Sequence, residues 1–138
     1  DRAHHLAELV RPALERGDWV ISDRHVPSSL VYQGVARGLG VDEVASINKW
    51  ATAGMEPDLV VVLDLPDSEV DARRAGRGGA SDRLELEGAE FHAAVRGAYR
   101  DLAVKRGWEL VDASGDQAEV GKSVIALLEA RLGRPTPS

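Results

Sequence analysis

The apolar run at residues 59–63, Leu-Val-Val-Val-Leu, constrains the fold of this chain more than any other segment. It is mostly β-branched and, at five residues, has the length of a strand rather than of a helix. Such runs are typical of parallel β-strands covered on both faces, because neither face needs polar side chains. The run therefore predicts a parallel sheet and an α/β protein.

Other strand-like and helix-like patterns alternate with this run. Two further strands are predicted at residues 19–22 and 108–111. Helical patterns cover residues 1–16, 28–37, 42–53, a stretch that starts at Asp67 or Ser68, 85–106 and 118–132. This alternation predicts parallel strands with helices on both faces. We expect a single α/β domain over residues 1–133 and a frayed, disordered tail over residues 134–138.

Particular residues are expected to shape the helix ends. Pro12 should kink or restart the first helix, and Gly17 should end it. Asp42 is expected to cap the helix at residues 42–53. The first helical pattern is already under way at Asp1, which predicts that further residues precede it.

The composition excludes several classes of protein. The 138 residues have the size of one domain, and their net charge of −6 argues against a protein that coats nucleic acid. The absence of cysteine excludes disulfides and thiolate metal sites, and it is compatible with a cytoplasmic location. The sequence has no apolar run long enough to span a membrane and no signal peptide. We expect no nucleic-acid or membrane partner.

The first candidate site is the dipeptide Asp23-Arg24, which directly follows the predicted strand at residues 19–22. Ligands of parallel α/β sheets bind beyond the carboxyl ends of the strands. Asp23 could hold Mg²⁺ directly or through water, and Arg24 could bind a phosphate bidentately. Alternatively, the two side chains pair with each other or cap the next element.

Ser28, Tyr32 and Gln33 follow at helical spacing and strengthen the hypothesis of a site. Positions i, i+4 and i+5 lie close together on a helix. A phenol ring and a carboxamide on one surface can stack on a base and hydrogen-bond to its edge. A half-buried tyrosine beside a solvated glutamine is the alternative.

The second candidate region is the Arg- and Gly-rich stretch that contains Arg73, Arg74 and Arg77. Glycines give a segment conformational freedom and arginines supply phosphate-directed donors, which suits a lid over a transferring phosphoryl group. A solvated loop is the alternative. Asp64 and residues 112–115 also follow predicted strands, and Asp64 is expected to cap the next segment rather than to catalyse. The four histidines show no spacing of paired metal ligands.

One phosphate-binding motif is missing. No segment of the chain matches G-x-x-x-x-G-K-[ST], the loop that normally cradles the phosphates beside such a strand.

Taken together, these segments resemble bacterial thymidylate kinase (dTMP kinase), and they do so over nearly the whole chain. The most specific is Asp23-Arg24-His25-x-x-Ser28-x-x-x-Tyr32-Gln33-Gly34. Others in the same order are Asp1-Arg2-Ala3, Arg11-Pro12-Ala13-Leu14, Arg37-Gly38, Pro57-Asp58-Leu59, Leu63-Asp64 and Asp82-Arg83-Leu84-Glu85. The resemblance implies a P-loop-kinase-like three-layer sheet and transfer of the ATP γ-phosphoryl group to dTMP, with Mg²⁺, to give dTDP.

On the acceptor side, the resemblance implies that Arg24 binds the dTMP phosphate and Asp23 organises the magnesium site, both as catalytic residues. Arg2 would hydrogen-bond to a thymine carbonyl. Ser28, Tyr32 and Gln33 would line the thymine pocket, with Gln33 at the edge of the base.

On the donor side, the resemblance implies a lid at about residues 73–84, whose arginines face the ATP phosphates. Arg74 and Arg77 are the catalytic candidates, together with Arg73 as an ATP-binding residue. Glu85 would lie near the nucleotide sugar or the metal, and Ala113 and Ser114 would lie beside the adenine. Leu84 stands where some members have tyrosine, so a hydroxyl there does not select the deoxyribose.

The chain also departs from the family pattern. The family's first two strands, with the P-loop and its lysine, precede the position of Asp1, so the fold class expected here is an incomplete sheet. In the family the first strand lies between the strands that match residues 19–22 and 59–63. We therefore expect this chain alone to be inactive. The family usually forms homodimers, and residues 42–55 with Trp50 are a candidate apolar face for such a contact. Packing in the core is the alternative role for each of these residues. The alternatives are a non-catalytic nucleotide-binding pseudoenzyme and another nucleotide kinase of the same fold.

Overall fold

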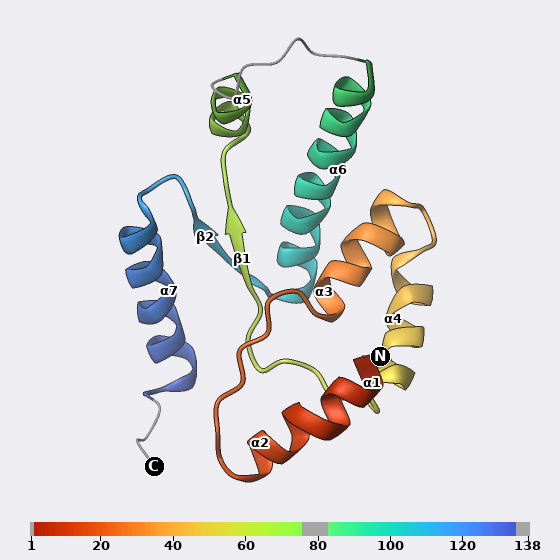
Figure 1. Ribbon diagram of the computed structural model, residues 1–138, viewed down its shortest axis with the longest axis vertical. Helices are drawn as coiled ribbons and strands as arrows, with labels where there is room; N and C mark the ends of the chain where they lie inside the picture. The colour runs from red at the N-terminus through yellow and green to blue at the C-terminus, as the bar shows by residue number, and fades with distance from the viewer. Residues whose placement is uncertain (1, 76–82, 135–138) are drawn as a thin grey trace. The chain divides into compact units, whose positions relative to one another are not determined.

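A computed structural model describes residues 2–75 and 83–134, apart from the side chains of Arg2, Asp71, residues 73–75 and residues 83–87 (Figure 1). The described chain divides into two compact units, Asp1–Asp58 and Leu59–Arg134. Each unit has its own helices and its own buried side chains, and each is described by itself. The expectation of one domain over residues 1–133 stays a prediction.

The first unit opens with one continuous helical stretch, as predicted. It consists of α1 (Arg2–His5), the π-helical turn η1 (Leu6–Val10) and α2 (Arg11–Glu15). The N–H of Arg11 donates to the carbonyl of Leu6, five residues back, so the widened turn directly precedes Pro12. Pro12 therefore lies in the first turn of α2, where its missing N–H costs little. Gly17, with φ of 86°, follows the helix end as predicted.

The strand predicted at residues 19–22 is wrong. These residues form no strand, and no other strand in the described part of the chain pairs with them. Their side chains are exposed, and Ile21 is 85% accessible. A single extended run cannot satisfy its backbone donors and acceptors alone, so apolar side chains without a neighbouring strand do not make a sheet.

The rest of the first unit is a helical hairpin. It comprises α3 (Val26–Ser29), the π-helical segment η2 (Leu30–Ala36) and α4 (Val41–Ala51). Leu30, Val31 and Val44 are buried and form its core. The two predicted helices are confirmed, but Asp42 is not the cap: Gly40, with φ of 88°, takes the N-cap position, and Asp42 lies in the first helical turn. A left-handed backbone at that point favours glycine over aspartate.

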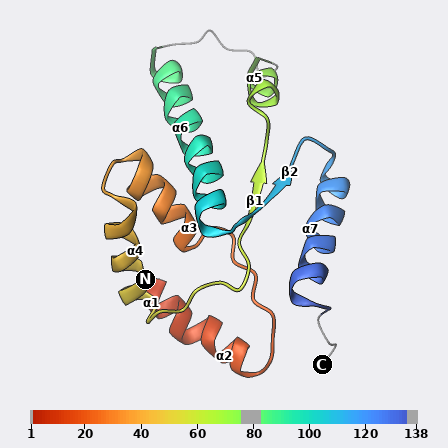
Figure 2. The same cartoon turned by 180° about the vertical axis from the view of Figure 1, so that it is seen from behind.

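The second unit contains a parallel pair of strands, β1 (Val61–Asp64) and β2 (Glu109–Asp112). Between them the chain passes through α5 (Asp67–Ala75) and α6 (Arg83–Arg106), and it ends in α7 (Gln117–Leu132). In both views α6 and α7 lie on either side of the pair (Figure 2). Two predicted strands and three predicted helices are thus confirmed, with bounds shifted by one or two residues.

The sheet of the described residues has two strands, which agrees with an incomplete parallel sheet in a helix-rich α/β protein. The core of the second unit is mostly supplied by the buried Val95, Ala98, Leu102 and Ala103 of α6, with Val111 from β2. Leu63 of β1 is 57% exposed, so the expectation of a strand covered on both faces is wrong for this residue. The β-branched run indicates a strand, but coverage depends on which elements pack against it.

Candidate functional site

Arg24 has an unusual backbone at the end of the extended run. Its φ is 61°, in the left-handed region that non-glycine residues rarely adopt, and the conformation costs of the order of 1 kcal/mol. Its guanidinium carbon lies 5.7 Å from the centroid of the Tyr32 ring, within the range of a cation–π contact. Strained non-glycine residues often occur at binding sites, so this conformation supports a functional reading of Arg24.

Asp23 and Arg24 neither pair with each other nor cap the next element, which is the alternative to a binding role. No ion pair joins the two side chains in the described part of the chain, and neither caps α3, whose N-cap is His25 without a side-chain cap. Both side chains are exposed. They are therefore accessible to a ligand.

Ser28, Tyr32 and Gln33 lie on the helical segment that follows, and all three are half-buried. Ser28 is in α3, and its N–H donates to the carbonyl of His25 at 3.1 Å. Tyr32 and Gln33 are in η2, and their carbonyls accept the N–H groups of Arg37 and Leu39, each at 3.1 Å. The turn after η2 is thus tied to the same two residues that the sequence predicts to contact a base.

Gly34 shows why the helical hairpin is compact at this point. A Cβ on Gly34 would lie 3.1 Å from the Cα of Val41 and 3.3 Å from the carbonyl oxygen of Gly40. The N–H of Gly40 donates to the carbonyl of Gly34 at 3.1 Å. The backbone of η2 therefore lies close to the start of α4, and any larger side chain at this position would require the backbone of Gly40 and Val41 to shift.

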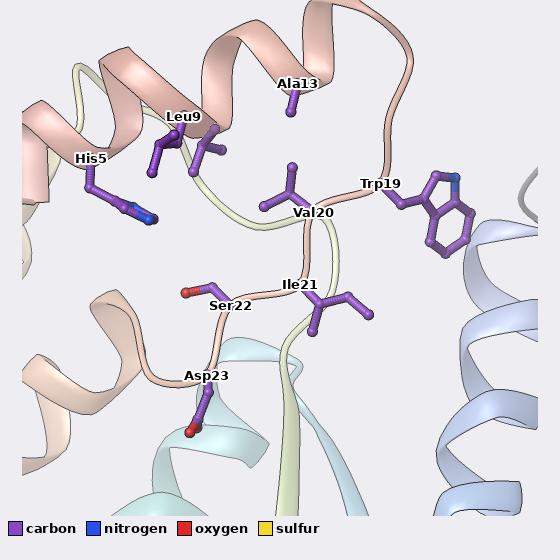
Figure 3. A pocket seen from close by; sticks show the side chains of 9 residues that line it. His5, Leu9, Ala13, Trp19, Val20, Ile21, Ser22 and Asp23 are labelled. Carbon is purple, nitrogen blue, oxygen red and sulfur yellow. The ribbon is translucent and has the colours of Figure 1, made fainter. Parts of the chain in front are cut away.

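A hollow of about 480 Å³ lies between the first helical stretch and the extended run (Figure 3). Its walls come from both segments: His5, Leu9, Val10, Ala13, Trp19, Val20, Ile21, Ser22 and Asp23. Val20 points towards the helix, whereas Ile21 and Asp23 point away from it (Figure 3). The hollow is mainly apolar, and the predicted phosphate ligand Arg24 does not line it.

In the second unit, two predicted regions meet at the carboxyl end of the strands. Asp64 and Asp112 are opposite each other in the parallel register, and the N–H of Ala113 donates to the carbonyl of Asp64 at 2.8 Å. The N–H of Ser114 donates to Oδ1 of Asp112 at 2.8 Å, and the Ser114 hydroxyl donates to the same oxygen. These hydrogen bonds from Ser114 lower the pKa of Asp112. Ala113 and Ser114 are therefore in a defined turn where α/β sheets bind ligands.

Asp64 does not cap the next segment as expected; it is paired with Arg100. The Nε of Arg100 donates to both carboxylate oxygens of Asp64, at 2.9 and 3.0 Å. Its other nitrogens reach Asp67 Oδ2 at 3.3 Å and the Leu65 carbonyl at 3.1 Å. Arg96 Nε donates to Asp67 Oδ1 at 2.8 Å.

Sequence reasoning missed both arginines of this cluster. The available signal was their spacing, because Arg96 and Arg100 are i and i+4 on a long predicted helix and so share one face. The partners, however, are 29 to 36 residues away, and nothing local identifies them.

The remaining predicted residues are described only in part. Arg73 and Arg74 are in α5, and Glu85 is in α6, while their side chains lie outside the described residues, as does the side chain of Arg2 in α1. Arg77 and most of the predicted lid at residues 73–84 also lie outside the described residues, and so do residues 135–138 of the predicted tail.

A near match to the phosphate loop is excluded by its position in the fold. Gly121-Lys122-Ser123 follow Gly115, but with one residue too many for G-x-x-x-x-G-K-[ST]. In a phosphate loop the lysine lies at the start of a helix, where N–H groups point at the ligand. Here α7 has already begun at Gln117, and Asp116 and Glu119 close its start with reciprocal hydrogen bonds. Lys122 is therefore an ordinary exposed helix residue.

The described residues contain no group of three or more metal-ligating side chains. Asp23 is a single accessible carboxylate, which fits Mg²⁺ only in the usual arrangement where phosphates and waters supply the other ligands. Among the helices described, none combines the length and apolar character needed to cross a bilayer.

A parallel strand pair with polar groups at its carboxyl ends is the arrangement found in α/β nucleotide-binding proteins. The family model described as thymidylate kinase matches residues 1–124. The chain belongs to the thymidylate kinase family, a family of phosphotransferases.

Curated relatives with the same name cover nearly all of the chain. The thymidylate kinase of Leifsonia xyli subsp. xyli is 44% identical over 133 residues, which are 96% of this chain and 63% of the relative. Those of Lactobacillus delbrueckii subsp. bulgaricus and Symbiobacterium thermophilum are each 46% identical, over 94% and 96% of this chain and 62% of the relative. The chain thus spans about three-fifths of the length of these relatives, and it matches their C-terminal portion.

Proposed function

We propose that this chain supplies the acceptor-binding residues and part of the ATP-facing residues of a thymidylate kinase. The reaction transfers the γ-phosphoryl group of ATP to an oxygen of the dTMP phosphate. The γ-phosphorus of ATP forms a bond to that oxygen, and its bond to the β–γ bridging oxygen breaks, so that ADP and dTDP form. The family match supports this class of reaction. The single observation that carries the proposal is the strained Arg24, held over Tyr32.

The acceptor role of Arg24 has a physical basis. A guanidinium binds a phosphate through parallel N–H donors, and such binding is strongest when the arginine is already oriented. The aromatic ring of Tyr32 supplies that orientation. In this proposal Ser28, Tyr32, Gln33 and Arg2 bind the thymidine part, with Gln33 at the edge of the base.

The donor role belongs to the second unit. We assign Arg73, Arg74 and Arg77 to the ATP phosphates, with Arg74 and Arg77 nearest the transferred group, and Glu85 to the sugar or metal. Ala113 and Ser114 are assigned to the adenine, which the ordered turn after β2 supports. Phosphoryl transfer depends mainly on positioning and charge neutralisation, which arginines provide.

Magnesium would be held through Asp23 and the nucleotide phosphates. When bound there, Mg²⁺ would supply positive charge to the phosphoryl oxygens; Asp23 would help to hold it, and Arg24 would hold the acceptor phosphate. We place the reaction in the cytoplasm, with which the absence of cysteine is compatible.

We also propose that the intact protein is a homodimer. Ile47 and Trp50 of α4 are 68% and 87% exposed, and large exposed apolar side chains on one helix are typical of an interface. This helix is the predicted partner face.

A non-catalytic nucleotide-binding module is the second candidate, because the 138 residues contain no G-x-x-x-x-G-K-[ST] loop. For the same reason we expect no dTDP formation by this chain alone. Another nucleotide kinase of the same fold is the third candidate, and a competition panel of nucleoside monophosphates separates it from a thymidylate kinase.

Calorimetry of the 138-residue chain with dTMP tests the acceptor assignment. We expect measurable binding that Arg24→Gln weakens by about 10- to 100-fold, since a hydrogen bond to a charged group contributes roughly 1.5–3 kcal/mol. Arg11→Gln is the matched control, because Arg11 is an exposed arginine of the same unit outside the proposed site. Equal losses in both variants would show a general charge effect, and dTDP formation at the rate of an intact kinase would refute the expected inactivity.

A further inference from the structure

Four charged side chains from β1, α5 and α6 form one connected cluster, defined here as the β1–α5 clamp: Asp64, Asp67, Arg96 and Arg100. Arg100 donates to Asp64 at the end of β1, to the carbonyl of Leu65 in the turn, and to Asp67 at the start of α5. Arg96 adds a second donor to Asp67. One guanidinium from α6 thus touches three successive parts of the turn.

The two halves of the clamp differ in exposure. The side chains of Asp64 and Arg100 are 29% and 32% exposed, whereas Asp67 is 58% exposed. An exposed ion pair contributes little because water and salt compete for it, whereas a less exposed pair, such as the one in which Nε of Arg100 donates to both oxygens of Asp64, is held more firmly. The Asp64–Arg100 pair is therefore the fixed part, and Asp67 is the weaker part.

The arrangement also balances the charges within the clamp. Two carboxylates and two guanidinium groups cancel, so Asp64 and Asp67 add no excess of negative charge to that of Asp112 at the end of the strands. A lysine at position 100 would keep the charge balance but would lose the planar fork that reaches three acceptors. Charge and geometry can therefore be tested separately.

We propose that Arg100, assisted by Arg96, is a positioning residue that fixes the β1–α5 turn against α6 and so sets the direction in which α5 leaves the strand. The geometry carries this inference independently of any ligand. Its consequence for catalysis rests on the proposed function: α5 carries Arg73 and Arg74, so an unfixed turn would misplace the arginines assigned to ATP.

Hydrogen exchange of backbone amides, measured by NMR on the 138-residue chain, tests the inference. Arg100→Met and Arg100→Lys should both accelerate exchange of the α5 amides of Val70, Asp71 and Ala72 by about tenfold, because the lost bonds involve charged partners. Amides of α7 should change by less than about twofold. Failure of Lys to restore slow exchange is the sign of a geometric role rather than a purely electrostatic one.

Arg131→Met and Arg131→Lys are the matched controls. Arg131 also joins a helix of the second unit to a strand, through its ion pair with Glu109 of β2. These variants should leave α5 exchange unchanged. The positioning role is refuted if the Arg131 variants accelerate amide exchange in α5 as much as the Arg100 variants do. It is also refuted if Arg100→Lys accelerates amide exchange equally in α5 and α7.

Two further measurements keep the test decisive. Should Arg100→Met fail to fold, Asp64→Ala, which removes the acceptor of the less exposed pair, must still accelerate exchange in the first turn of α5, and an unchanged rate would overturn the inference. Calorimetry with dTMP should give the same affinity in Arg100→Lys as in the wild type, because the acceptor residues are in the other unit. Absence of dTMP binding in the wild type would count against the proposed function, and the exchange rates would still decide the role of Arg100.

Discussion

The guanidinium of Arg24 lies over the ring of Tyr32, 5.7 Å from its centroid, although eight residues separate the two in the chain. The left-handed backbone at Arg24 turns the chain from the extended run into α3 and leaves the arginine facing the helix that carries Tyr32. Two residues that the sequence predicts as ligands of the same nucleotide thus contact each other.

Replacing Tyr32 separates the role of its ring from the role of its hydroxyl. Tyr32→Phe keeps a ring face for Arg24, so dTMP affinity should stay close to that of the wild type. Tyr32→Leu removes the cation–π contact and should weaken binding about two- to fivefold. Calorimetry measures both, with circular dichroism to check the fold. If Phe and Leu weaken binding equally, the hydroxyl rather than the ring matters.

Gly34→Ala should destabilise the first unit. The new methyl group meets backbone atoms of Val41 and Gly40, which cannot rotate away, so we expect a loss of about 1–3 kcal/mol in the free energy of unfolding. Gly121→Ala is the control in urea titrations: it adds a methyl group in open space within α7 and should gain roughly 0.5–1 kcal/mol. A neutral Gly34→Ala would mean that η2 and α4 can separate freely.

Acid should release Asp67 from the clamp. Hydrogen bonds from Arg96 and then from Arg100 lower the pKa of Asp67 below its ordinary value of 3.8. The contribution of this carboxylate is therefore fully present above that value and is lost as the pH falls through the lower pKa of the folded state. A carboxyl ¹³C titration should show a midpoint below 3.8, and Arg96→Met should raise it towards 3.8.

Asp112 is the internal reference for that titration. Ser114, and neither arginine of the clamp, lowers its pKa. Its midpoint should therefore stay the same in Arg96→Met. A parallel shift of Asp67 and Asp112 would point to a change in the whole unit instead of the loss of one partner.

Asp116→Ala should shorten or loosen α7. Its side chain accepts the N–H of Glu119 at 2.9 Å, and the Glu119 side chain accepts the N–H of Asp116 in return. Loss of such a cap typically costs about 1 kcal/mol. Gln117→Ala, one residue along and exposed, should change unfolding by less than about 0.5 kcal/mol. If Asp116→Ala and Gln117→Ala lowered the free energy of unfolding equally, loss of the helix cap would not be the cause.

Trp50→Glu tests the proposed dimer face. A charge at this exposed position should prevent association, which sedimentation velocity detects as loss of the dimer. Val104→Glu is the matched control, because Val104 is 81% exposed on α6 and is not part of the proposed face. A wild-type chain that stays monomeric at all concentrations would contradict the dimer for this chain.

Patterns within short stretches predicted most of the secondary structure. Helices at residues 28–37 and 118–132 and the strand near Val61 have periodic or β-branched sequences, and these local properties decide their conformation. The strand at residues 19–22 has a similar apolar sequence but no partner strand in the described part of the chain. Strand pairing depends on residues far away in the sequence, so the local pattern alone could not show that residues 19–22 form no strand.

The same distinction applies to the candidate site. Arg24 and Tyr32 belong to one motif, and the structure brings them together. Arg100 and Asp64 are 36 residues apart and meet only because α6 packs beside β1, so the sequence predicts Asp64 as a cap of the next segment and gives no sign of this pair. The N-cap of α4 is Gly40 rather than Asp42, because the backbone there has a positive φ, which a sequence pattern does not reveal.

The open run at residues 19–22 has a consequence for the behaviour of the chain in solution. Its backbone donors and acceptors, together with its own exposed side chains Trp19 and Ile21, offer a template on which another polypeptide can add a β-strand, which is a common route to aggregation. The net charge of −6 keeps copies apart at low ionic strength. Added salt screens that repulsion, so the solubility of the chain should fall as the salt concentration rises.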